Sequence, residues 1–216
     1  KLAAPAWRQQ AAPDWKVRRL VWLLFGTFPT LQTIRCRYSR SAARGAPACG
    51  TTCPLCHAGP ETMSHLLSAC GRYHNFYTVR HDRVVRRLWA WFGGQRDWVT
   101  RHYMGVSATN RTPAFPPTLL AALPAALRDV HPDLVLQSRG PEGAWWLLDV
   151  AVTGQTHDWP TLAAAKAARY VDLCRAITAA MGQPCQAVPV VFSARGTVPR
   201  ATCQALMRLT PADPAA

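Results

Sequence analysis

The stretch that decides the fold runs from residue 131 to residue 152 and contains two apolar segments, each with one aspartate. They are His131-Pro132-Asp133-Leu134-Val135-Leu136 and Trp145-Trp146-Leu147-Leu148-Asp149-Val150-Ala151-Val152. Short runs rich in Val, Leu and Trp are typical of strands, so we expect neighbouring strands near 133–137 and 145–152. Because an unpaired carboxylate is costly to bury, Asp149 should meet a cation: a metal ion, a lysine or an arginine.

The helix expected next, near residues 161–181, supplies basic groups for such a site. Lys166, Arg169 and Tyr170 stand at i, i+3 and i+4, hence on one face of that helix. Two carboxylates suit a hard divalent cation, and a nearby ammonium suits the charge of a phosphodiester under attack. Two interpretations stay open: a metal-dependent nuclease site, or a structural aspartate–arginine pair with Lys166 in solvent.

The remaining pattern of this half predicts a sheet covered by helices. We expect a helix at 118–128, a strand near 186–193 and a last helix near 199–209. Strands interspersed with helices predict an α+β or α/β domain over residues 111–210, with a central mixed sheet flanked by helices.

The charge of the chain predicts a polyanionic partner. The 216 residues include 25 Lys and Arg but only 11 Asp and Glu, a formal net charge of +14. Nucleic acid is the simplest such partner. GC-rich coding could explain why arginine outnumbers lysine, but not why basic residues outnumber acidic ones.

Other features of composition narrow the class of protein. Hydrophobic residues make up 49%, so the chain is not disordered overall. No apolar run approaches the roughly 20 residues that span a bilayer, so no membrane partner is expected. The chain begins at Lys1 without a Met, which predicts a piece of a longer protein.

Residues 1–48 are expected to form a basic helical linker region. Helical spacing recurs from Pro13 to Phe25, a second helix begins near Thr30, and residues 39–50 have the composition of a linker. This region could contact a nucleic-acid backbone, or it could be a packing module with a solvated arginine face.

A cluster of cysteines and histidines predicts a zinc site. The spacing is Cys53-x2-Cys56-x8-His65-x4-Cys70, which suits a tight turn followed by a short helix. Four nitrogen and sulfur ligands are typical of a closed, structural zinc site in a reducing compartment. The metal would supply folding energy that so short a segment cannot obtain from a core. Alternative ligands nearby are Cys49, His57 and His74.

A basic amphipathic helix is expected next and completes a second segment, residues 49–110. Val84, Leu88 and Trp91 form its apolar stripe. The arginines could bind phosphates, or they could be a solvated face. The candidate nucleic-acid contacts are Arg72, Arg80, Arg83, Arg86, Arg87 and Arg169. Residues 105–117 have the composition of a boundary.

In this order, the residues resemble the PD-(D/E)xK restriction-like nucleases. Asp133 follows a proline, Asp149 lies in a strand, and a lysine lies in the next helix. The sequence departs from that pattern at Ala151, where the lysine of D-x-K would stand. The run from Lys166 to Tyr170 is similar to the K-x-x-K/R-Y run of one group, the restriction-like endonuclease of site-specific non-LTR retrotransposons. These belong to the R-two clade, which inserts into large-subunit ribosomal RNA genes.

The resemblance extends upstream and covers about residues 20 to 195. It includes Gly26-Thr27-Phe28-Pro29-Thr30 with Arg37 and Arg44, the zinc knuckle with Glu61 and Thr62, and Arg80-His81-Asp82 after His74. The knuckle of that family usually has a spacer one residue shorter.

The resemblance implies a C-terminal fragment of a retrotransposon polyprotein that acts in the nucleus. It would nick target DNA so that the exposed 3′-hydroxyl primes reverse transcription. Target DNA is the implied partner, template RNA is a second candidate, and the rest of the polyprotein carries the reverse transcriptase.

The resemblance also implies roles for single residues. Asp133 and Asp149, with a strand carbonyl such as that of Val150, would hold Mg²⁺ or Mn²⁺. Lys166 would orient the attacking water or neutralise charge on the phosphate, and Tyr170 or Arg169 would position the lysine or a neighbouring phosphate. The zinc would be structural.

Two other functions stay open at this stage. One is a non-catalytic module that grips nucleic acid, and the other is a scaffold for the polymerase. Divalent metal bound between Asp133 and Asp149 would favour the nuclease, whereas carboxylates neutralised by arginine without metal binding would favour the binding module.

Overall fold

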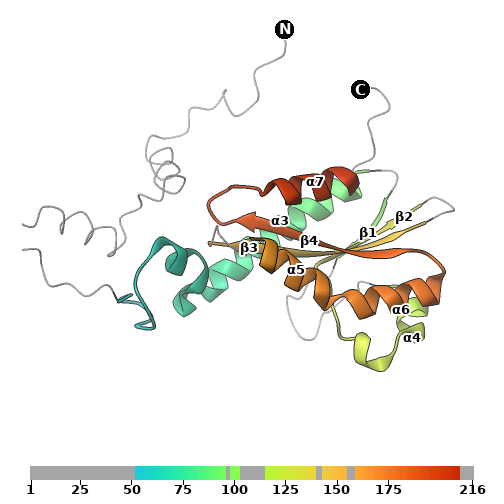
Figure 1. The fold of residues 1–216 in the computed structure, drawn as a ribbon, viewed down its shortest axis with the longest axis horizontal. Helices are drawn as coiled ribbons and strands as arrows, with labels where there is room; N and C mark the ends of the chain where they lie inside the picture. The colour runs from blue at the N-terminus through green and yellow to red at the C-terminus, as the bar shows by residue number, and fades with distance from the viewer. Residues whose placement is uncertain (1–51, 96–97, 103–114, 140–142, 155–158, 210–216) are drawn as a thin grey trace, which may run out of the picture. The chain divides into compact units, whose positions relative to one another are not determined.

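The computed structural model describes residues 52–95, 98–102, 115–139, 143–154 and 159–209 (Figure 1). The chain divides into two compact units, Lys1–His74 and Asn75–Ala216. We call the described part of the first the knuckle unit and that of the second the sheet unit. The helices expected near 13–25 and after Thr30, and the linker expected at 39–50, lie outside the described residues, as does most of the boundary expected at 105–117.

A four-stranded mixed sheet forms the centre of the sheet unit. Its strands are β1 (Trp98–His102), β2 (Leu134–Ser138), β3 (Trp145–Thr153) and β4 (Cys185–Ser193), in the order β1-β2-β3-β4. The pairs β1–β2 and β2–β3 are antiparallel, and β3–β4 is parallel. The predicted α+β class with a mixed sheet is confirmed, while β1 is a strand that the sequence pattern did not predict.

Helices cover both faces of this sheet (Figure 1). One face packs against α3 (His74–Gly93) and α7 (Arg200–Leu209), and the other against α4 (Pro117–Ala122) and α6 (Val171–Met181). Alternate strand residues divide between these faces, as the two-residue period of a strand requires. Leu134, Leu136 and Leu148 face α3 and α7, whereas Val135 and Leu147 face α4 and α6.

The helix predicted at 118–128 ends early because of a proline. The helix α4 stops at Ala122, Leu123 is extended (ψ 143°), and a 3₁₀ turn follows at Ala125–Leu127. The ring of Pro124 disfavours helical dihedrals at the residue before it, which accounts for the extended Leu123. The single long helix was therefore a wrong prediction.

The helix predicted at 161–181 is two helices, α5 (Trp159–Arg169) and α6. Tyr170 separates them, with φ −107° and ψ 5°, outside the helical region. Its ring is fully buried and belongs to the core between α4, α6 and the sheet. We attribute the break between α5 and α6 to the burial of this ring. The helical periodicity of the sequence gives no indication of that burial.

The basic helix α3 belongs to the sheet unit through its apolar face. Val85, Leu88 and Phe92 are buried there, and the Phe92 ring meets Trp98 of β1 edge-on with centroids 6.4 Å apart. The predicted stripe was displaced, because Trp91 is 43% exposed. The sequence pattern grouped this helix with the zinc knuckle, whereas its core contacts are with the sheet. No helix among the described residues is long and apolar enough to cross a membrane.

Candidate zinc and carboxylate sites

Four side chains of the knuckle unit converge as the sequence predicted. The ligand atoms of Cys53, Cys56, His65 and Cys70 all lie within 4.8 Å of one another. The Cys53 and Cys70 sulfurs are 3.9 Å apart, and Cys56 Sγ lies 3.1 Å from His65 Nε2. In a tetrahedron with Zn–S bonds of about 2.3 Å, sulfurs lie about 3.8 Å apart. The cluster could hold a metal ion, and its donors are consistent with structural zinc.

A turn and a π-helix bring these ligands together. The Cys53 N–H donates to the Gly59 carbonyl (2.8 Å), and the His57 N–H donates to the Cys53 carbonyl (3.0 Å). His57 has φ 55°, in the left-handed region. This conformation helps to close the turn between Thr52 and Pro60, which form an isolated antiparallel bridge. His65 begins a π-helix (His65–Ala69), in which the Cys70 N–H donates to the His65 carbonyl (2.8 Å). The five-residue hydrogen bond of a π-helix matches the five-residue separation of these two ligands.

The alternative ligands are not part of the cluster. His57 and His74 are exposed and lie outside the group of four, and Cys49 lies outside the described residues. Burial acts to raise the pKa of the Cys53 thiol, but the Cys56 and Leu55 amides and the His65 side chain bring that pKa to about 7. A thiol with a lowered pKa readily supplies the thiolate that a metal needs.

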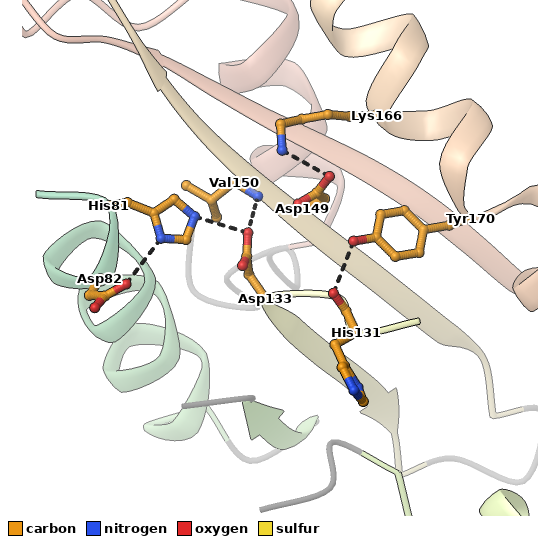
Figure 2. A network of polar contacts seen from close by, with 8 residues as sticks. All are labelled: His81, Asp82, His131, Asp133, Asp149, Val150, Lys166 and Tyr170. Atoms are coloured by element: carbon orange, nitrogen blue, oxygen red, sulfur yellow. Dashed lines mark hydrogen bonds and ion pairs between the residues drawn. The ribbon is translucent and has the colours of Figure 1, made fainter. Parts of the chain in front are cut away.

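Asp133, just before β2, lies close to Asp149, in the middle of β3, at the point where the β2–β3 pairing ends (Figure 2). Asp133 precedes β2, and its Oδ2 accepts a hydrogen bond from the Val150 N–H of β3 (2.7 Å). Asp149 projects from β3 and is only 5% exposed. The end of the β2–β3 ladder therefore places one carboxylate beside the other.

Lys166 of α5 points at Asp149, with Nζ 2.9 Å from Oδ2 (Figure 2). Asp149 Oδ2 is buried, and the Lys166 ammonium lies beside it as the other half of an ion pair. A divalent cation between the two carboxylates would neutralise more of their combined negative charge.

The two carboxylates influence each other's protonation. Burial raises the pKa of Asp149, the neighbouring Asp133 adds to the rise, and Lys166 opposes it. Burial also acts to raise the pKa of Asp133, but the His81 side chain and the Val150 N–H outweigh burial and hold that pKa below its usual value. Mutual shifts of this kind are typical of two acids that share one site.

Tyr170 fixes the segment that leads to Asp133. Its hydroxyl donates to the His131 carbonyl at 3.1 Å (Figure 2). Burial, with the nearby charge of Asp149, raises the pKa of Tyr170, so the phenol stays protonated and cannot act as a base at neutral pH. Arg169 is exposed, and its guanidinium lies 5.5 Å from the centroid of the Tyr170 ring.

His81 of α3 was named from the sequence only as part of the Arg80-His81-Asp82 run, with no role beside the carboxylates. Its Nε2 lies 3.2 Å from Asp133 Oδ2, and its Nδ1 lies 3.2 Å from Asp82 Oδ1 (Figure 2). The contact with Asp133 is the largest cause that raises the pKa of His81 to about 9, so the ring is an imidazolium at neutral pH. The sequence held one indication of this role: His81 lies one helical turn before Val85, on the face of α3 that packs against the sheet.

The predicted arginine contacts fall into different environments. Arg80 is partly buried, donates to the Val152 carbonyl (3.3 Å), and has a pKa lowered by burial. Arg83, Arg86 and Arg87 are exposed along α3. Arg72 is exposed in the knuckle unit. The exposed arginines are therefore accessible to a nucleic acid, whereas Arg80 is partly buried and bonded to β3.

No protein-family model matches this sequence, and no curated protein is significantly similar to it. The argument for function therefore rests on the chemistry of the two sites.

Proposed function

We propose that the sheet unit is a divalent-metal-dependent endonuclease that nicks DNA, and that the knuckle unit holds structural zinc beside it in the chain. One observation carries the proposal: the carboxylates of Asp133 and Asp149 and the ammonium of Lys166 meet where the β2–β3 pairing ends, and Asp149 is almost completely buried. A lone structural salt bridge would not need the second carboxylate.

The donor set fits Mg²⁺ or Mn²⁺. Both hydrogen bonds to Asp133 fall on Oδ2, so Oδ1 can bind a cation while the carboxylate stays fixed. Hard divalent cations take carboxylate oxygens and keep several waters, which two aspartates allow. When bound, the ion would polarise the scissile phosphate and lower the pKa of an attacking water.

The residues of the chain would position and neutralise the reacting groups. Lys166 would stabilise charge on the phosphate, because its ammonium already lies beside Asp149. His81 and the Val150 N–H would keep Asp133 in place, and Tyr170 would hold the preceding backbone at His131. The excess of basic residues over the whole chain would attract the DNA.

The resemblance described above extends the proposal to a biological role. The nick would expose a 3′-hydroxyl that primes reverse transcription of a non-LTR retrotransposon in the nucleus. The partners would be target DNA such as a ribosomal RNA gene, template RNA, and a polyprotein that contains the reverse transcriptase.

A nicking assay on supercoiled plasmid or target duplex with Mg²⁺ or Mn²⁺ tests the activity. We expect Asp149→Ala and Lys166→Ala each to reduce the nicking rate by about 100-fold or more, because each removes a charge from the reacting centre. Asp172→Ala is the matched control, since Asp172 is an exposed carboxylate paired only with exposed Arg175. Nicking that survives Asp149→Ala or Lys166→Ala would rule the proposal out.

A second candidate function is a non-catalytic nucleic-acid-binding module. One observation favours it: each aspartate already has a cationic partner within the chain, His81 for Asp133 and Lys166 for Asp149. Calorimetric titration with Mn²⁺ separates the candidates. Binding that Asp149→Ala abolishes supports the nuclease, and no binding at millimolar Mn²⁺ supports the module. A third candidate is a structural scaffold for the polymerase. This function would be favoured if the basic surface were found buried against another domain of the full protein.

A further inference from the structure

A groove of about 820 Å³ runs beside α3 in the sheet unit, and neither Asp133 nor Asp149 lines it. Its lining includes Phe76, Arg83, Arg87 and Trp91 from α3, and Phe192 from β4. Phe76 is 69% exposed and Trp91 is 43% exposed, so a large part of each side chain is accessible from solvent. Large exposed aromatics that line one groove are uncommon on a surface that meets only water.

The lining residues form one stripe along the helix. Positions 76, 80, 83, 87 and 91 follow one another at intervals of three or four residues, which places them on one face of α3. The stripe that packs on the sheet is the neighbouring one, with Val85 and Phe92. The groove stripe therefore has aromatic rings at its two ends and, between them, the exposed Arg83 and Arg87 and the partly buried Arg80.

The chemistry of this stripe selects its ligand. The lining of the groove contains the exposed Arg83 and Arg87, the partly buried Arg80 and no carboxylate, a set that favours an anionic ligand. Exposed aromatic rings add faces on which flat groups can stack. A polynucleotide with unpaired bases offers both features, because its phosphates pair with guanidinium groups and its bases stack on rings. In a duplex, the bases are already stacked on one another.

We propose that this groove binds single-stranded nucleic acid. Phe76 and Trp91 would stack on bases, and Arg83 and Arg87 would contact the intervening phosphates. Phe76 and Trp91 are fifteen residues apart, which corresponds to about 22 Å along the helix. That length holds about six nucleotides at the 3.4 Å spacing of a stacked strand, and fewer when the strand is stretched.

Other occupants fit the charge less well. The amphipathic segment expected near 13–25 of this chain carries Lys16, Arg18 and Arg19, so it has the same sign of charge as the groove. An acidic peptide would match the charge but would gain little from the aromatic rings. The proposal stands apart from the nuclease activity, since strand binding needs neither Asp149 nor Lys166.

Fluorescence anisotropy of a labelled ten-nucleotide oligothymidylate tests the proposal, with the complete chain in zinc-containing buffer without Mg²⁺. We expect Phe76→Ala and Trp91→Ala each to weaken binding by about fivefold or more with little change in salt dependence. Arg83→Ala and Arg87→Ala should each reduce the slope of log affinity against log salt by about 0.7. Trp91→Phe, which keeps a stacking face, should retain most of the affinity.

Trp89→Ala and Arg86→Ala are matched controls. Trp89 is 41% exposed and Arg86 is exposed on the same helix, but neither lines the groove. The proposal is overturned if Phe76→Ala and Trp91→Ala bind as the wild type does, or if Trp89→Ala loses as much affinity. It is also overturned if a hairpin duplex or polyglutamate binds as tightly as the oligothymidylate and responds equally to Phe76→Ala and Trp91→Ala.

Discussion

At the scale of single residues, His81 sets the charge balance around Asp133. Its imidazolium lies between Asp133 and Asp82, while Lys166 lies beside Asp149. Each buried or half-buried carboxylate thus has a cation, which offsets the cost of removing its charge from water. Loss of one cation would leave the other charge of the pair uncompensated.

The pH dependence of stability should report this pair. The pKa of His81 is about 9 in the folded chain against 6.5 for a free histidine, so its stabilising contribution is complete below pH 6.5 and is lost as the pH rises through about 9. In buffer without Mg²⁺, we expect His81→Gln to lower the free energy of unfolding by about 1–3 kcal/mol at pH 6. The difference from the wild type should shrink by pH 9.5, as measured by urea unfolding.

NMR titration of the His81 ring provides the control. Asp133→Asn should lower the pKa of His81 more than Asp82→Asn does, because the contact with Asp133 is the largest cause of the shift. An equal effect of the two substitutions, or a stability difference that does not change with pH, would contradict the assignment.

At the scale of elements, one threonine of α7 joins that helix to the outermost strand. Thr202 Oγ1 donates to the Val191 carbonyl (2.9 Å) and accepts from the Val191 N–H (3.2 Å). In the described sheet, β4 is a terminal strand that pairs with β3 alone. The hydroxyl of Thr202 therefore satisfies backbone groups that an edge strand would otherwise leave open to another chain.

The substitution Thr202→Val tests this link with almost no change of shape. Thr202 is 3% exposed, so the loss of its hydroxyl leaves both polar groups of Val191 without a partner in a dry environment. We expect the free energy of unfolding to fall by about 1–3 kcal/mol. Thr118→Val, at an exposed position of α4, should change it by less than about 0.5 kcal/mol. Equal effects in urea unfolding would show that the hydroxyl does not anchor α7.

At the scale of the whole molecule, the two units have separate sources of stability. The hydrophobic clusters of the sheet unit take all their members from residue 84 onward. The knuckle unit has few buried side chains besides Cys53, Met63 and Cys70, two of which are candidate ligands. We therefore expect the knuckle unit to depend on the binding energy of a metal to stay folded.

Removal of zinc should therefore unfold one unit and spare the other. We expect Cys56→Ser, or a strong chelator, to remove about one zinc per chain. Hydrogen exchange followed by mass spectrometry should then show lost protection in residues 52–74, with protection of β2, β3 and β4 retained. Measurement of metal content on the same samples links the two effects. Lost protection in the strands would show that zinc also supports the sheet.

Local patterns were sufficient for much of the fold and for the four residues of the candidate zinc site. The strands β2, β3 and β4 and the helix α7 lie within about two residues of their predicted positions, because alternation and apolar runs are properties of neighbouring residues. The spacing of Cys53, Cys56, His65 and Cys70 identified a cluster that could hold a metal ion, since ligand spacing is set by the turn and helix that carry it. The isolated carboxylate of Asp149 in an apolar strand pointed to a cationic partner in the same way.

Only the tertiary structure decided which distant residues complete these elements. The strand β1 gains its stability from pairing with β2, and the break at Tyr170 coincides with the burial of one ring and a bond to the His131 carbonyl. His81 meets Asp133 across 52 residues of sequence, a contact that depends on the packing of α3 on the sheet. Periodicity describes one element at a time, whereas these contacts arise from free energies that elements gain only when they pack together.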